Sequence, residues 1–256
     1  MTEQVNSRFR AYAESNIGCV REENQDTYAV HAIGEGMLAV VCDGMGGAAG
    51  GRVAADMACD AFCRGFSSTY EEMIGREMHT AFDMHRVYNS VIYAANQVVF
   101  EQAAADEALR GMGTTIAAAY VIDNSLYVTN VGDSRVYLLH RGELVRISHD
   151  DSLVQQMIDS GQISEAEAAQ SEGRHILTRA LGTTPYVECG FYTATLEKDD
   201  ILLLCSDGLT AHYSDRELAA FLQQPGDTVS LVRGLIEGTC ARGGQDNVTV
   251  VCLMVG

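Results

Sequence analysis

The sequence predicts an α+β fold in which antiparallel strands form the core and helices come in blocks. Short apolar segments recur along the 256 residues, and many are separated by turn residues such as Asp123-Asn124-Ser125 and Arg141-Gly142-Glu143. Turns this short join antiparallel neighbours. Helical periodicity appears in a few longer stretches rather than after every strand, which favours α+β layering over a doubly wound parallel sheet.

Apolar runs of strand length predict the strands. The longest, Met37–Cys42, Ile116–Ile122 and Ile201–Cys205, fall far short of the ~18–20 apolar residues that cross a bilayer, so no membrane span is expected. The expected strands are Phe9–Ser15, Thr27–Ile33, Met37–Cys42, Thr114–Ile122, Ser125–Val131, Arg135–His140, Glu143–Ile147, Val187–Thr193, Ile201–Cys205 and Val248–Met254.

Three-and-four spacing of apolar residues predicts the helices. The spacing is clearest between Thr80 and Gln102, where one apolar stripe is formed by Met84, Val87, Tyr88, Val91, Ile92, Ala95, Val98 and Val99. Shorter helices are expected at Gly51–Phe66, Ser152–Ser160, Ser164–Ala169, Asp215–Gln223 and Thr228–Ala241.

Composition predicts one globular domain, residues 1–256. Apolar residues make up 47%, only two prolines occur, and composition does not shift along the chain. The N-terminal residues are polar and lack a basic-then-apolar targeting pattern, which predicts a cytoplasmic protein.

The charge balance restricts the partners. Seventeen basic residues stand against thirty-five acidic ones, a net charge of −18, and such a surface repels nucleic acid. A phosphorylated substrate would be repelled as well. A phosphate site would therefore need a strong local positive charge, which bound metal and a placed Arg could supply.

The eight cysteines contain no C-x-x-C pair. Cys42, Cys205 and Cys252 lie in apolar runs, where Cys behaves as a small hydrophobic residue. Cys59 and Cys63, four apart in a predicted helix, either pack in the core or share a soft metal. Core packing is favoured, because no second pair completes a metal site.

Aspartates at strand boundaries are the most informative feature. Asp43 and Asp207 each end an apolar strand and precede a glycine; the others are Asp26, Asp133 and Asp246, beside the strands beginning at Thr27, Arg135 and Val248. Each could simply begin or end a turn. Five of them placed in this way instead suggest convergence on one site.

Converging carboxylates need compensation. Two charges ~5 Å apart at an effective dielectric of ~20 repel by about 3 kcal/mol. Oxygen ligands select hard cations, Mg²⁺ or Mn²⁺, over softer metals. Two such ions would orient and acidify a bridging water, which is the equipment of a phosphate-ester hydrolase.

Two other residue types bear on this site. The guanidinium of Arg21 offers a planar fork that matches two phosphate oxygens, although a surface pair with Glu22 or Glu23 is the alternative. The seven histidines show no paired spacing for zinc, so surface or turn positions are expected for them.

Taken in order, these motifs resemble the metal-dependent protein phosphatases of the 2C type. The motifs are Arg21-x-x-Asn24-Gln25-Asp26, Asp43-Gly44-Met45-Gly46-Gly47, Gly113-Thr114-Thr115, Val131-Gly132-Asp133-Ser134-Arg135, Ser206-Asp207-Gly208 and Gln245-Asp246-Asn247. The resemblance runs from about Ala13 to Val251. Ser148–Gln156, Leu177–Gly182 and Met45 are similar to the bacterial Ser/Thr phosphatases of this family.

The resemblance implies a central antiparallel β-sandwich with helix pairs on both faces, and a mobile flap at about residues 152–182. It also implies two metals, Mn²⁺ or Mg²⁺: Asp43 would bridge both, the Gly44 carbonyl would bind one, and Asp207 and Asp246 would hold the other. Asp133 would help bind a weaker third.

For the reaction, the resemblance implies in-line attack of a metal-bridged water on a phosphoserine or phosphothreonine ester. Asp26 would orient that water, and Arg21 would hold the phosphate. The partners would be phosphorylated proteins, with a bacterial Ser/Thr kinase as the opposing enzyme.

The chain departs from the family pattern at three positions. Gln25 stands where many members have Glu, Met45 replaces a His proposed as general acid, and Ala211 replaces an Asp often found near the third metal. Gln25 weakens a contact to metal-bound water, and Met45 leaves the protonation of the leaving group unassigned. Ala211 weakens the site of the third metal.

Three other hypotheses compete with this one. Gly44–Ala49 fits the glycine pattern of a dinucleotide site, but Asp43 would face the pyrophosphate and no second parallel strand follows. Ser134 could be a serine-hydrolase nucleophile, but a strand rather than a helix follows it. A catalytically silent phosphatase-like domain that binds phosphoproteins or regulators is the third, although the chain keeps Asp43, Asp207 and Asp246.

Overall fold

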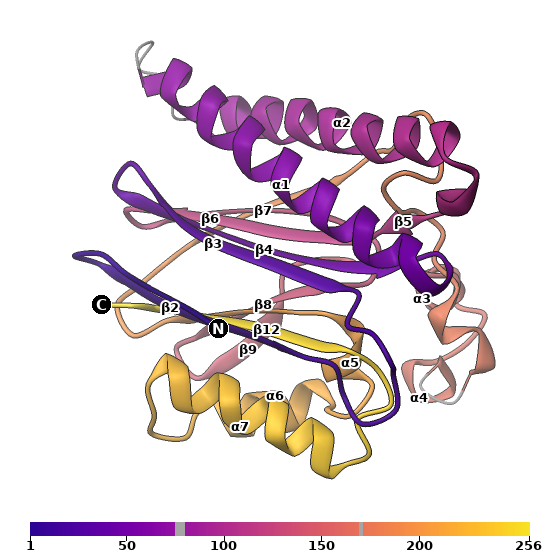
Figure 1. Cartoon of the computed structure of the whole chain (residues 1–256). Coiled ribbons are helices and arrows are strands. Elements are labelled where there is room, and N and C mark those ends of the chain that lie inside the picture. The colour runs from indigo at the N-terminus through magenta and orange to yellow at the C-terminus, as the bar shows by residue number, and fades with distance from the viewer. Residues whose placement is uncertain (75–79, 169–170) are drawn as a thin grey trace.

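The computed structural model describes residues 1–74, 80–168 and 171–256. They form four layers, with two antiparallel sheets face to face and helices on both outer sides (Figure 1). The α+β sandwich expected from the sequence is confirmed. Among the described residues, none of the helices has both the length and the apolar character that spanning a bilayer requires.

The first sheet has the order β1-β2-β12-β11-β8-β9. Its strands are β1 (Thr2–Val5), β2 (Phe9–Asn16), β12 (Val248–Val255), β11 (Ile201–Cys205), β8 (Arg135–His140) and β9 (Glu143–Arg146). The last strand in the sequence, β12, therefore lies in the interior of the sheet, between β2 and β11.

The second sheet has the order β10-β7-β6-β4-β3, with β5 paired to the end of β4. Its strands are β10 (Gly190–Thr195), β7 (Ser125–Val131), β6 (Ile116–Ile122), β4 (Gly36–Met45), β3 (Asp26–Ile33) and β5 (Gly113–Thr114). The pairings of both sheets are antiparallel throughout the described residues.

The central strands are apolar on both sides because both of their faces are buried. In β4, Leu38 and Val40 point to the helices while Met37, Ala39 and Val41 point into the space between the sheets. The side chains of β11 and β12 likewise point alternately into the space between the sheets and toward the helices on the outer side of the first sheet. This explains why the sequence shows unbroken apolar runs rather than alternation.

Long helices cover the second sheet, and shorter ones cover the first. Helices α1 (Gly47–Ile74) and α2 (Ala81–Ala105) lie on the β4 side, while α6 (Asp215–Leu222) and α7 (Thr228–Ala241) lie on the β12 side (Figure 1). Capping boxes at Thr80, Ser214 and Asp227 begin α2, α6 and α7 at the positions where the apolar stripes begin.

Short elements lie beside the sandwich. They are α5 (Asp207–Thr210), directly after β11, the 3₁₀ turn η1 (Glu107–Leu109) and, between β9 and β10, α3 (Leu153–Asp159), α4 (Glu165–Ala168) and η2 (Glu172–His175). Figure 1 shows α3 and α4 near the end of the sandwich where α1 begins. The flap predicted at about residues 152–182 would include these elements, although residues 169–170 lie outside the described residues.

Several predicted boundaries were wrong. Helix α1 continues past Phe66 because Phe66 and Tyr70, one turn apart, both pack against Tyr120. Strand β1 was missed because it is a short edge strand with only one half-covered face. The expected strand Thr114–Ile122 is divided into β5 and β6, and Val187–Thr193 is displaced to β10; residue 169 of the expected helix Ser164–Ala169 lies outside the described residues.

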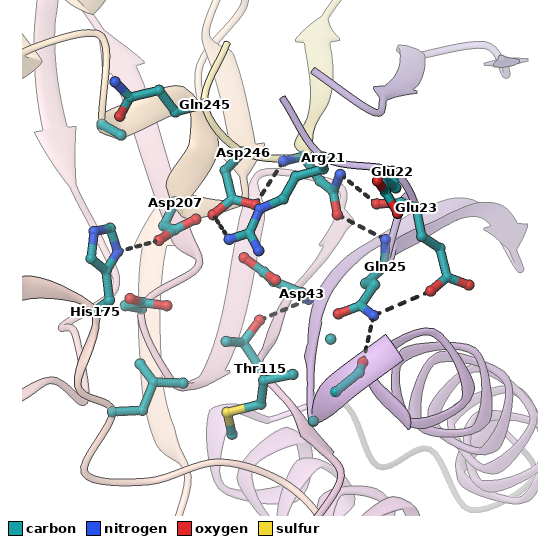
Figure 2. Close-up of a pocket in the computed structure, with 18 residues that line it drawn as sticks. Arg21, Glu22, Glu23, Gln25, Asp43, Thr115, His175, Asp207, Gln245 and Asp246 are labelled. Atoms are coloured by element: carbon teal, nitrogen blue, oxygen red, sulfur yellow. Dashed lines mark hydrogen bonds and ion pairs between the residues drawn. The ribbon is translucent and has the colours of Figure 1, made fainter. Parts of the chain in front are cut away.

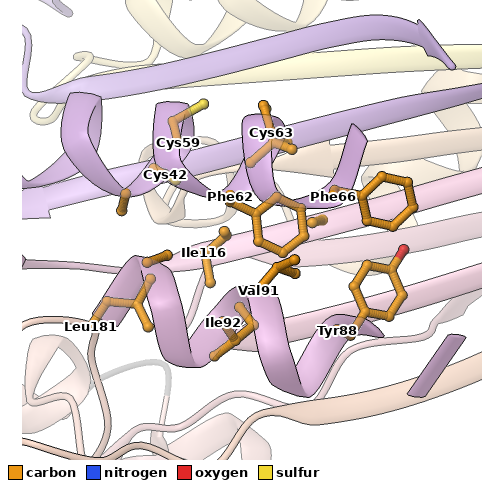
Figure 3. Close-up of a cluster of buried hydrophobic side chains, with 14 of the residues drawn as sticks. Cys42, Cys59, Phe62, Cys63, Phe66, Tyr88, Val91, Ile92, Ile116 and Leu181 are labelled. Carbon is orange, nitrogen blue, oxygen red and sulfur yellow. The ribbon is translucent and has the colours of Figure 1, made fainter. Parts of the chain in front are cut away.

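Cys59 and Cys63 pack in the helix-facing core beside Cys42 and Phe62 (Figure 3). Cys63 also contacts His31, but no three Cys, His, Asp or Glu side chains of the described residues are gathered as a metal site, so packing accounts for the pair. Phe66 lies at the centre of this core, with ring centroids 5.0 Å from Tyr120 and 5.6 Å from Tyr88.

Replacement of Phe66 by alanine should destabilise the protein by about 3–5 kcal/mol, because a fully buried ring is lost and a cavity remains. Urea unfolding followed by circular dichroism measures the change. Phe82→Ala, at a side chain that is 68% exposed, is the control and should cost far less. Equal losses for the two variants would contradict the described core.

Candidate metal centre and active site

A cavity of about 680 Å³ lies where the strands carrying the predicted aspartates end. Strand β4 ends here, and its antiparallel neighbour β3 begins here. Strands β7 and β11 also end here, and strands β8 and β12 begin here. The cavity is lined by Arg21, Asp43, Gly44, Asp133, Asp207 and Asp246, from segments up to 225 residues apart. The structure therefore brings these six predicted residues together. Figure 2 labels four of them, Arg21, Asp43, Asp207 and Asp246.

Asp43 is held by backbone contacts on both sides. Its N–H donates to the Thr115 hydroxyl at 3.0 Å, while its carbonyl accepts from the Thr115 N–H and the Thr114 hydroxyl, both at 2.9 Å. The Thr115 hydroxyl in turn bonds the buried Ser134 hydroxyl at 2.7 Å. The Gly113-Thr114-Thr115 motif thus fixes the backbone of Asp43 and leaves its carboxylate to the cavity.

The glycines after Asp43 and Asp207 are required by close backbone approach. A Cβ atom on Gly44 would lie 2.0 Å from the carbonyl oxygen of Gly51 in α1, and a Cβ on Gly208 would lie 2.0 Å from that of Asn247. A side chain at either position would push the strand end away from its neighbour. The Asp-Gly pairs therefore place each carboxylate where two elements meet.

Asp26 lies behind the cavity and is 2% exposed. It faces Asp43 directly in the β3–β4 register. Its Oδ2 accepts from the Ser206 hydroxyl at 2.7 Å, whereas its buried Oδ1 has no hydrogen-bond partner among the described residues. Burial, opposed in part by the hydroxyls of Thr249 and Ser206, raises the pKa of Asp26 to about 6.

Arg21 and Asp246 form an ion pair at 2.7 Å across the cavity mouth (Figure 2). The segment that carries Arg21 is anchored by Asn247, whose side-chain amide donates to the carbonyls of Ile17 and Glu23, both at 2.9 Å. Its Oδ1 accepts from the Gln25 N–H at 2.8 Å. One side chain next to Asp246 therefore fixes the segment that holds Arg21.

The segment between β9 and β10 contacts Asp207 and the turn that carries Asp133. His175 Nδ1 lies 3.4 Å from Asp207 Oδ2, which brings a residue of η2 into the cavity wall. The turn that carries Asp133 is held by Asp151: the Asp151 carboxylate accepts from the Gly132 N–H at 3.1 Å and pairs with Arg179 at 2.7 Å.

The electrostatics of the site are dominated by crowded carboxylates. Burial, and then the charges of Asp26, Asp207, Asp133 and Asp246, raise the pKa of Asp43 well above its usual value. Burial and the charge of Asp207 do the same to the pKa of Asp133, although Arg135 opposes them. The anionic form of this cluster is therefore unstable unless cations enter.

The residues present fit hard dications. The donors are oxygens only, the buried Asp26 Oδ1 atom has no hydrogen-bond partner among the described residues, and Asp246 pairs with the Arg21 cation. Within the described ranges no three Asp, Glu, His or Cys side chains are gathered closely enough to hold an ion.

The structure also shows residues whose roles the sequence did not reveal. Ser206, Asn247 and Thr115 stand inside the recognised motifs, but only their contacts identify them as supports. His175 was expected at a surface or turn position; its side chain is 53% exposed, yet it also reaches Asp207. No local pattern marks a contact made across 32 residues.

The three departures from the family pattern line the same cavity. Gln25 donates to the Gly47 carbonyl at 2.9 Å and to Glu23 at 3.3 Å, so its amide is tied to the start of α1. Met45 and Ala211 contribute apolar surface to the wall.

Two competing hypotheses disagree with the structure. The strand before Gly44 has only antiparallel neighbours in the described chain, whereas a dinucleotide site needs a parallel βαβ unit. Ser134 is 0% exposed and bonded to Thr115, so its hydroxyl is not presented as a nucleophile.

Comparisons with known proteins agree with this site. The family profile described as "Protein phosphatase 2C" matches residues 20–234. The serine/threonine phosphatase stp of Listeria monocytogenes is 32% identical over 244 residues, which cover 95% of this chain and 94% of that protein. PstP of Mycobacterium tuberculosis is 37% identical over 243 residues, covering 95% of this chain and 44% of that longer protein.

A solved structure of the catalytic domain of PstP in complex with two manganese ions has the same fold. Its TM-score is 0.82 at 33% identity, with 97% of this chain and 98% of that chain covered. The family profile, the similarity to stp over 94% of its length and this shared fold show that the chain belongs to the protein phosphatase 2C family.

Proposed function

We propose that the chain is a metal-dependent protein serine/threonine phosphatase, which hydrolyses phosphoserine and phosphothreonine esters of other proteins. The observation that carries this proposal is the convergence of four aspartates and Arg21, from separate segments, on one cavity. Relatives named serine/threonine phosphatases support it, at 32–37% identity over 95% of the chain.

The ligand roles that we propose rest on the motif match to the protein phosphatase 2C family. Asp43 would bridge two ions, Mn²⁺ or Mg²⁺, with the Gly44 carbonyl on one of them and Asp207 and Asp246 on the other. Asp133 would contribute to a third, weaker site beside Ala211. When bound, the ions would neutralise charge on the phosphoryl oxygens and lower the pKa of a coordinated water.

The protein's own groups would position the reactants. The free Oδ1 atom of Asp26, fixed by Ser206 on the other oxygen, would accept a hydrogen bond from the attacking water and orient it. Arg21, once Asp246 is engaged elsewhere, would be released to hold two phosphate oxygens in its planar fork. Displacement would be in line, and stabilisation of the transition state mainly electrostatic.

The substrates would be phosphorylated proteins, with a Ser/Thr kinase as the opposing enzyme. The segment at residues 152–182 lies against Asp207 and the Asp133 turn, so we propose it as the flap that contacts the protein substrate. A single catalytic domain and a cytoplasmic location stay predictions from the sequence.

Metal removal should abolish activity. Treatment with EDTA should stop hydrolysis of para-nitrophenyl phosphate, and added Mn²⁺ should restore it, because the carboxylate cluster requires cations. A serine-directed reagent should have no effect. Absence of hydrolysis at any Mn²⁺ concentration would instead support the catalytically silent alternative.

Asp207→Asn should lower kcat by on the order of 10²–10³-fold or more, because one charged ligand is lost from an electrostatic site. Steady-state kinetics with a phosphopeptide and Mn²⁺ titration measure this effect. The matched control is Asp60→Asn, at a side chain 57% exposed on α1, which should behave as wild type. A wild-type kcat for Asp207→Asn would exclude its role.

Arg21→Ala should mainly raise KM for a phosphopeptide, because the residue binds phosphate in both the ground and the transition state. Arg64→Ala, which removes a 75% exposed guanidinium on α1, controls for loss of surface charge. An unchanged KM in Arg21→Ala would show that the assignment is wrong.

A further inference from the structure

Two thiols from distant parts of the chain meet beside the segment that carries Arg21. Cys19 is exposed and lies two residues before Arg21, whereas Cys240 is half-buried in the last turn of α7. Five of the other six cysteines are buried, and Cys189 bonds Asn89. The Cys19–Cys240 pair belongs to none of the packed core clusters.

The contacts between the two residues are close. The Cys19 thiol donates to the Cys240 carbonyl at 3.6 Å, and the Cys19 N–H donates to the Gly244 carbonyl at 2.7 Å. A Cβ atom on Gly244 would lie 3.0 Å from the Cys19 sulfur and 3.2 Å from the Cys240 Cα atom. The distance from the Cys19 sulfur to the Cα atom of Cys240 is therefore at most the sum of these two distances.

The glycine between them makes this approach possible. Gly244 has a φ of +47°, which places it in the left-handed region, and any side chain there would separate the two cysteines. On the Cys19 side, a Cβ on Gly18 would lie 2.2 Å from the Asp246 carbonyl oxygen. The backbones of the two segments are therefore in close contact at Gly18 and Gly244.

We propose that Cys19 and Cys240 form a reversible disulfide when the protein meets a hydroperoxide. This inference rests on the proposed phosphatase function only for its effect on activity, not for the bond itself. Transient, regulatory disulfides of this kind are the type found in reducing compartments.

The chemistry balances with one peroxide per disulfide. The exposed Cys19 thiolate attacks a peroxide oxygen, the O–O bond breaks, and a sulfenic acid and one water (or alcohol) are formed. The Cys240 thiol then attacks the oxidised sulfur, the S–O bond breaks, and a second water leaves as the disulfide closes. Burial and the adjacent Cys19 thiol raise the pKa of Cys240, which keeps more of it in the unreactive thiol form, so the first step is assigned to the exposed Cys19.

The disulfide would act on the site through segment 17–25. Closure shortens the sulfur–sulfur separation to ~2.0 Å and draws Cys19 toward the end of α7. Arg21 is two residues away and paired with Asp246, and Asn247 already fastens the same segment at Ile17 and Glu23. A tethered segment would resist the movement that takes Arg21 from Asp246 to the phosphate.

The bond is tested without reference to activity. The purified protein is treated with hydrogen peroxide, quenched with an alkylating reagent and digested, and its peptides are identified by mass spectrometry. The expected result is a Cys19–Cys240 cross-link that dithiothreitol removes and that is absent in Cys240→Ser and Cys19→Ser. Cys189→Ser is the control and should still form it.

Activity is then measured on the same samples. Oxidation should raise the KM for a phosphopeptide by at least ~3-fold in wild type and Cys189→Ser, with reversal by dithiothreitol, and leave Cys240→Ser unchanged. Overoxidation of Cys19, a different cross-link or no reaction would overturn the proposal. A cross-link with unchanged KM would overturn its regulatory part, whereas failure of the reduced protein to hydrolyse phosphate would count against the proposed function alone.

Discussion

The mutual repulsion of carboxylates at the ends of buried strands is the constraint on which this molecule depends. Asp26 and Asp43 face each other across a strand pair, and the pKa of each is raised by burial. Such an arrangement costs free energy of folding unless cations compensate it. The described structure shows partial compensation by Arg21, and hard dications would complete it.

The sandwich withstands this repulsion because each carboxylate is fixed through its neighbours. Thr115 holds the backbone of Asp43, Ser206 holds the side chain of Asp26, and Asn247 holds the segment beside Asp246. These supports lie directly beside the ends of β6, β11 and β12, strands whose two faces are both covered by apolar layers. Rigid surroundings of this kind preorganise a site for an electrostatic reaction.

Much of the fold could be predicted from local patterns. Strands β7, β8 and β11 and helix α7 have the predicted bounds, because turn residues and caps mark them. The patterns failed where tertiary packing decides, as at α1, which Tyr70 extends beyond Phe66 by packing on Tyr120. Edge strand β1 was missed because three of its four residues are polar.

Part of the candidate site could be predicted, because an Asp-Gly pair at the end of an apolar strand indicates a carboxylate held in a fixed position. Their supports could not, since Asn247 contacts residues 224 and 230 positions away and leaves no periodic trace. The pairing of Arg21 with Asp246 is likewise a property of the folded chain.

The interior place of β12 has a consequence for synthesis of the protein. This strand pairs with both β2 and β11, and Asp246 and Asn247 immediately precede it. A growing chain on the ribosome therefore lacks a central strand of one sheet, and part of the cavity wall, until residues 246–255 have emerged. Contacts of such high sequence separation form late and slowly. Products truncated before Asp246 would accordingly lack β12 and part of the cavity wall, and would be inert.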